Sequence, residues 1–179
     1  MTWGSLEALA AMVAAVAAVV AIWLQNKSFK ANLTADLAMK LDDRFGSPEY
    51  REIRSRAARA LQEHIGEEDA EEVFDFFELV GLFTRRKALD AEIVHSIFFH
   101  WINVYWTAGK GHIASRQRSA NSLWKDFGNL YRKVLEVEMK EDPSSQDISL
   151  SADDLERYLN GEIALMPLGA TAGDSQEGR

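Results

Sequence analysis

Residues 8–24 read ALAAMVAAVAAVVAIWL, and this run decides how the rest of the chain is organised. It holds no charged residue, no Pro and no Gly, and its length lies at the lower end of what crosses a hydrocarbon core as a helix. Trp3 and Trp23 are separated by roughly 30 Å of helix, about one core thickness, and Trp prefers the two headgroup levels. The run predicts one membrane-spanning helix, with Trp3 and Trp23 as its interfacial anchors.

The charges that flank this span predict its orientation. No Lys or Arg precedes the run, where Glu7 is the only charged residue, whereas Lys27, Lys30, Lys40 and Arg44 follow it. Because positively charged flanks stay in the cytoplasm, the N-terminus is expected outside and the remainder of the chain inside. The lipid bilayer is therefore the first partner that the sequence predicts.

Two other interpretations of residues 8–24 stay open. A secretory signal peptide would find small-residue cleavage sites in AVA and AAV, but the basic region that precedes such a segment is missing. A fully buried helix of a soluble bundle is also apolar all round. An interfacial amphipathic helix requires a polar face, which this run lacks.

Small residues recur every four positions within the span, at Ala10, Ala14 and Ala18. This spacing lets two transmembrane backbones approach closely, so the three alanines are candidates for self-association or for packing against a partner span. The alternative is that an alanine-rich run produces the spacing by chance.

Composition limits the chemistry that the chain can perform. Its 179 residues carry a formal net charge of −8, which argues against nucleic-acid binding, and the absence of cysteine excludes disulfides and thiolate metal sites. Glu92 and His95 form one E-x-x-H motif, but no second motif accompanies it. Phosphate-binding glycine loops and nucleophile elbows are also absent. No catalytic residue, metal or cofactor is expected.

Apolar periodicity and capping residues predict that everything after the span is α-helical. A stripe of apolar residues over 29–45 predicts that the first helix continues from the membrane to Gly46, unless a short break falls at residues 25–28. Ser47 as N-cap and Pro48 in the first turn then begin a second helix.

Three further helices are expected in the bundle. Acidic residues over 67–72 open a third helix, whose dense apolar face forms the centre of the core. Asp90 is the N-cap of the fourth, which Gly109 and Gly111 are expected to weaken or bend. A fifth helix begins near residues 120–121.

The expected organisation has four parts. Residues 1–26 form the transmembrane anchor, and residues 27–142 form a cytoplasmic bundle of about five helices. Residues 143–168 hold a linker and a short docking helix with the capping pattern of Ser151. Residues 169–179 are small and polar and are expected to be disordered.

Four arginines are candidates for contacts with an acidic partner or with lipid phosphates: Arg51, Arg54, Arg85 and Arg86. The other interpretation is a solvated face on which these arginines pair with nearby acidic residues. The sequence alone does not decide between the two.

Three functions are compatible with these features. The first is a membrane-tethered interaction or regulatory module, in which the span raises the local concentration of a protein partner. The second is a small-ligand sensor or an enzyme with a cleft between the third, fourth and fifth helices, where Glu78, His95, His100 and Tyr105 would converge. The third is a subunit of a larger membrane complex for transport or defence.

Five segments after the span carry recognisable motifs: FGSPEY at 45–50, V-x-x-F-F-E-x-x-G at 73–81, ALD at 88–90, the aromatic block 101–106 and W-x-x-F at 124–127. Together they resemble a broad bacterial family of uncharacterised, single-pass membrane-anchored helical proteins that carry a domain of unknown function. The resemblance covers roughly residues 27–138, and it implies a helical domain at the bacterial inner membrane without implying any activity or catalytic residue.

Overall fold

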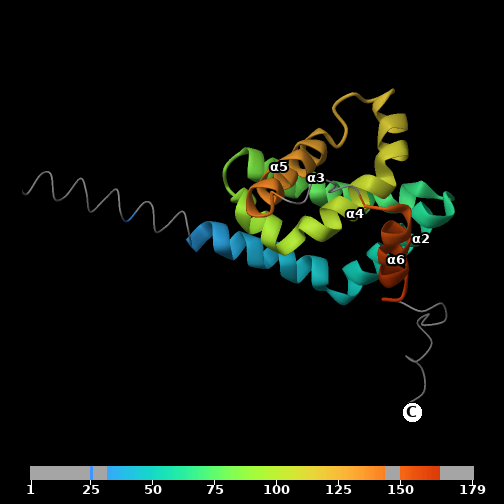
Figure 1. Ribbon diagram of the computed structural model, residues 1–179, viewed down its shortest axis with the longest axis horizontal. Helices are drawn as coiled ribbons and strands as arrows, with labels where there is room; N and C mark the ends of the chain where they lie inside the picture. The colour runs from blue at the N-terminus through green and yellow to red at the C-terminus, as the bar shows by residue number, and fades with distance from the viewer. Residues whose placement is uncertain (1–24, 26–31, 144–149, 166–179) are drawn as a thin grey trace, which may run out of the picture.

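The computed structural model describes Gln25 and residues 32–143 and 150–165. These residues contain helices and no strand, which confirms the all-α prediction (Figure 1). A helical segment over residues 32–46 is followed by α2 (Pro48–Glu63), the 3-10 turn η1 (Glu67–Ala70), α3 (Glu71–Arg85), α4 (Ala91–Gln117), α5 (Lys125–Glu141) and α6 (Ala152–Ile163).

Apart from Gln25, the predicted anchor lies outside the described residues, and with it lie Trp3, Trp23, Ala10, Ala14 and Ala18. Residues 144–149 and 166–168 of the predicted linker and docking segment also lie outside them, as does the predicted tail. Among the residues that the structure does describe, no helix combines the length and the apolar character needed to cross a membrane.

Capping residues mark the starts of three helices as predicted. Ser47, Asp90 and Ser151 are the N-caps of α2, α4 and α6, and each side-chain oxygen accepts a hydrogen bond from a backbone N–H in the first turn. These bonds satisfy donors that have no partner within the helix, which is why short polar residues at these positions predict a helix start.

Two predicted starts are wrong by several residues. The acidic segment after Gly66 first forms the 3-10 turn η1, so α3 begins at Glu71. α5 begins at Lys125 and not near 120–121, because Trp124 has the left-handed backbone conformation, with φ of 50°, at its N-cap. A buried tryptophan in that conformation is not a pattern that local propensity predicts.

The two glycines of α4 do not end the helix, which continues through both to Gln117. Gly109 leaves room for the buried Phe74 ring of α3. A Cβ atom at position 109 would lie 2.3 Å from Cζ of that ring. A glycine inside a helix costs about 1 kcal/mol relative to alanine. The close packing of the Phe74 ring on α4, which only glycine permits at this position, offsets that cost.

α3 lies at the centre of the core, as its apolar face predicts. Phe74, Phe77 and Val80 are fully buried, and the Phe77 ring stacks on Phe127 of α5 with centroids 5.3 Å apart. Phe45 joins this aromatic core from the end of the 32–46 segment. Figure 1 shows α6, in red, against α2 at the opposite end of the bundle from the blue start of the 32–46 segment.

We expect Lys87→Gly to stabilise the protein by about 0.5–1 kcal/mol. Lys87 is exposed and follows α3 with φ of 58°, where its N–H donates to the Thr84 carbonyl oxygen. Glycine adopts this conformation without the penalty that a Cβ atom imposes. Urea denaturation of the two proteins measures the difference, and a loss of stability in the variant would contradict this interpretation of the α3 terminus.

Candidate functional site

The most elaborate polar arrangement among the described residues holds α6 onto α2 and α4. The apolar part of this joint is small. Leu159 of α6 is buried against Ala58 of α2 and Val104 of α4, and Leu155 and Ile163 pack beside it. The small Ala58 side chain lets α6 approach α2 closely.

Arg54 supplies the main polar contact of this joint. Its side chain is only 7% exposed, and its Nε and one terminal nitrogen each donate to a different carboxylate oxygen of Glu162, both at 2.6 Å. The other terminal nitrogen donates to the Phe45 carbonyl oxygen at 3.1 Å. Such a paired, two-bond contact between guanidinium and carboxylate is strong and geometrically specific.

Two side chains of α4 complete the surroundings of the Glu162 carboxylate. Trp101 Nε1 donates to Oε1 at 3.2 Å, and the Tyr105 hydroxyl donates to Oε2 at 3.1 Å. Burial, reinforced by the nearby carboxylate, raises the pKa of Tyr105 well above its usual range, so the phenol keeps the proton that it donates. The Arg54 guanidinium also lies over the Phe45 ring, 4.3 Å from its centroid.

We call Arg54, Trp101 and Tyr105 the carboxylate receptor. They come from two helices and place four N–H or O–H donors around one carboxylate, which is only 12% exposed. A buried charge is tolerated when it is paired and hydrogen-bonded on all sides, and it is costly otherwise. The receptor can therefore bind a carboxylate presented by a helix.

The four predicted partner-binding arginines do not form one set. Arg51 and Arg86 are exposed, whereas Arg54 is buried against Glu162. Arg85 donates from Nε to Asp126 of α5 at 2.7 Å. Arg54 thus satisfies a carboxylate of its own chain, and it does not face outward as a solvated arginine would.

The cleft that was predicted between the third, fourth and fifth helices does not assemble its four side chains. Glu78 accepts the Phe127 backbone N–H at 2.6 Å, while His95 contacts Glu138 at 2.7 Å. His100 lies instead against the ring of Tyr158 on α6. These groups join pairs of helices at separate places, and Tyr105 belongs to the carboxylate receptor.

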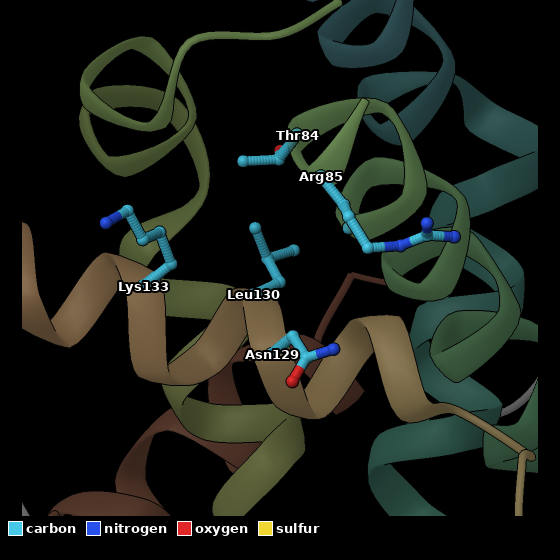
Figure 2. A pocket seen from close by; sticks show the side chains of 6 residues that line it. Thr84, Arg85, Asn129, Leu130 and Lys133 are labelled. Atoms are coloured by element: carbon cyan, nitrogen blue, oxygen red, sulfur yellow. The ribbon is translucent and has the colours of Figure 1, made fainter. Parts of the chain in front are cut away.

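A small cavity of about 250 Å³ opens between α3 and α5, but its polar side chains diverge. Figure 2 shows the Arg85 guanidinium and the Lys133 amine pointing away from each other, on opposite sides of Leu130. Arg85 reaches Asp126, and Lys133 pairs with Glu136 at 2.8 Å. Within the ranges that the structure describes, no cluster of three or more His, Cys, Asp or Glu side chains could hold a metal.

Sequence comparison places these features in a family. A model described as a domain of unknown function (DUF4760) matches residues 8–134, well over half of the chain. The chain belongs to the DUF4760 family. This agrees with the uncharacterised family that the motifs predicted. Comparison with curated proteins and with solved structures gave no match.

The residues that meet at the α6 joint lie partly inside and partly outside the range that matches DUF4760. Arg54, Trp101 and Tyr105 lie inside the matched residues, while Glu162 and the rest of α6 lie beyond them. The carboxylate receptor thus lies within the residues that match DUF4760, and the helix that occupies it follows them in sequence. The signal for this site is weak in the sequence, because Arg54 and Glu162 are 108 positions apart.

The Arg85 contact in the DUF4760 domain predicts a pH effect. A hydrogen bond from Arg85 lowers the pKa of Asp126 below its usual range. The stabilisation is complete above the unfolded carboxyl pKa of about 4 and is lost as the pH falls through the lower folded pKa. Asp126→Asn should therefore lower the free energy of unfolding at pH 7, and the difference from wild type should shrink below about pH 4.

Urea denaturation at pH 7 and pH 3 checks this expectation. Glu136→Gln is the matched control, because its partner Lys133 is exposed and such surface pairs contribute little at either pH. A deficit for Asp126→Asn that is equal at both pH values would contradict a charge-based role.

Proposed function

We propose that this DUF4760 protein is a membrane-tethered interaction module that binds a helix of a partner protein on the surface formed by α2 and α4. The carboxylate receptor supports this most directly, because the domain already holds one helix through Arg54, Trp101 and Tyr105. Placing an amphipathic helix on a groove with one specific polar contact is a recurrent mode of protein recognition.

The membrane part of the proposal rests on the sequence. Residues 8–24 would span the bacterial inner membrane, with the N-terminus outside and the helical domain in the cytoplasm. Confinement to the membrane surface raises the effective concentration of the domain for partners that are held there too. Ala10, Ala14 and Ala18 would pack the span against a second span, from another copy or from the partner.

Extraction of membranes with alkaline carbonate tests the tether. The full chain should stay in the pellet, and a chain that begins at residue 27 should move to the supernatant. Protease added to spheroplasts should leave the helical domain intact. Recovery of the full chain in the aqueous fraction, or digestion of the domain from outside, would overturn the tether and its orientation.

Affinity purification of the full chain in mild detergent tests the partner. A protein recovered in stoichiometric amount, and lost when Val104 is changed to Glu, would support binding on the α2–α4 surface; the matched control is Arg51→Ala, a change at an exposed position. Recovery of this chain alone would overturn the interaction function. Recovery of several integral proteins together would favour a subunit of a larger membrane complex.

A further inference from the structure

We infer that α6 is an internal occupant of the partner site, and that the partner is a helix with the pattern Leu-x-x-x-Leu-x-x-Glu. The three fixed positions correspond to Leu155, Leu159 and Glu162. This inference rests on the proposed function and makes it specific. The partner and α6 would compete for one site, so the protein would bind its partner only when α6 leaves.

The acidic position follows from the donors of the receptor. Two guanidinium nitrogens, an indole N–H and a phenol all meet at the Glu162 carboxylate. A neutral side chain would leave the Arg54 charge buried without a counter-charge, which is costly. A ligand for this site must therefore carry a carboxylate, and it must present that carboxylate near its C-terminal end, as α6 does.

The apolar positions follow from the surface beside the receptor. Leu159 is 4% exposed and fits against Ala58 and Val104, and Leu155 lies one helical turn before it on the same face. Asp153 and Glu156 are exposed and make no hydrogen bond or ion pair with α2 or α4, although Glu156 lines the cavity beside the groove. Leu155, Leu159 and Glu162 therefore define the pattern, and Asn160 adds one polar contact by accepting from Gln62 of α2 at 3.0 Å.

α6 fills its groove incompletely. A cavity of about 430 Å³ lies beside its first two turns, between Ala152 and Leu155 on one side and Leu61, Thr107 and Ala108 on the other. This cavity is open to solvent, so an apolar side chain placed in it would remove apolar surface from water. A helix with a larger apolar side chain in place of Leu155 would bury more surface there than α6 does, so it could displace α6.

Displacement of α6 is physically accessible. A 12-residue helix is marginal on its own in water, so α6 depends on its groove for its structure. Its apolar side chains belong to a cluster separate from the aromatic core around Phe77 and Phe98, and only the Glu162 carboxylate reaches that core, at Tyr105. We therefore expect the ring contacts of the aromatic core to stay in place when α6 is released.

A peptide-binding experiment tests the inference on the full chain in detergent. A fluorescent peptide of residues 150–165 is titrated into the wild type and into a Glu162→Gln chain, whose own α6 is weakened. We expect the peptide to bind the Glu162→Gln chain at least about tenfold more tightly than the wild type, because the receptor is freed. A Leu159→Ala chain serves the same purpose without altering any polar group.

The peptide itself carries the matched controls. Glu162→Gln in the peptide should weaken binding at least about tenfold, whereas Glu156→Gln, which removes an exposed carboxylate of the same helix, should leave the affinity unchanged. Leu155→Phe in the peptide should strengthen binding by filling the cavity. Equal affinities for the Glu162→Gln and Glu156→Gln peptides would overturn the inference.

This result is separable from failure of the proposed function. If neither weakened chain binds the peptide although circular dichroism shows both to be folded, α6 is a fixed part of the fold and the inference is wrong. A partner captured by the full chain in that case would still support the interaction function on another surface. Recovery of the chain alone from membranes would overturn both.

Discussion

Replacing Arg54 by methionine is expected to lower the free energy of unfolding by about 3–5 kcal/mol. The change keeps most of the side-chain volume but removes the only charge that balances Glu162 among the described contacts, leaving that carboxylate 12% exposed beside an apolar side chain. Because Glu162 then favours leaving its site, much of the loss should appear as detachment of α6. Urea denaturation followed by circular dichroism measures the effect.

A second substitution separates loss of the pair from damage to the fold. In the double variant Arg54→Met with Glu162→Leu, no buried charge remains, and replacing a buried pair by apolar side chains is often close to neutral. The double variant should therefore recover most of the stability that the single variant loses. If the double variant is as unstable as the sum of the two single ones, the contact is not a balanced pair and the receptor is misassigned.

Gly81→Ala is expected to cost at least about 2 kcal/mol, because α3 and α5 touch backbone to backbone at this position. A Cβ atom on Gly81 would lie 2.3 Å from the Asp126 carbonyl oxygen. Relief of that clash requires the two helices to separate, which would also loosen the Arg85–Asp126 pair. Thermal or urea denaturation of the full chain gives the difference in stability.

Gly111→Ala is the matched control for this substitution. It makes the same chemical change inside α4, but outside the neighbouring backbone of α4 itself no heavy atom lies within 4 Å of the position of the new Cβ. Alanine is favoured over glycine in a helix by about 1 kcal/mol, so this variant should gain stability. Equal effects at positions 81 and 111 would show that helix propensity, and not the close contact, decides both.

Much of the fold could be predicted from local sequence. Ser47, Asp90 and Ser151 mark helix starts because a cap requires a short polar side chain next to its own backbone, which one sequence displays directly. The apolar face of α3 predicts the core because its helical spacing is likewise visible in a single stretch of sequence. Local patterns failed at Trp124, whose left-handed backbone conformation delays the start of α5, and they gave no sign of the Phe74 ring that packs on Gly109.

The candidate site was harder to predict because its parts are distant in sequence. Arg54 lies in an arginine-rich helix, and without its partner it has the pattern of a solvated residue. The partner, Glu162, lies 108 positions later, on a short helix with several other acidic residues. No spacing rule connects the two, so only the folded arrangement identifies this arginine as a receptor for a carboxylate.

Hydrogen exchange of the full chain tests the central claim most directly, because the claim requires α6 to leave a bundle that stays folded. The amides of α6 should exchange as one unit and well before those of α3 and α4, and Arg54→Met should speed exchange in α6. Exchange of α6 only together with α3 and α4 would contradict the account, since α6 would then be an inseparable part of the core.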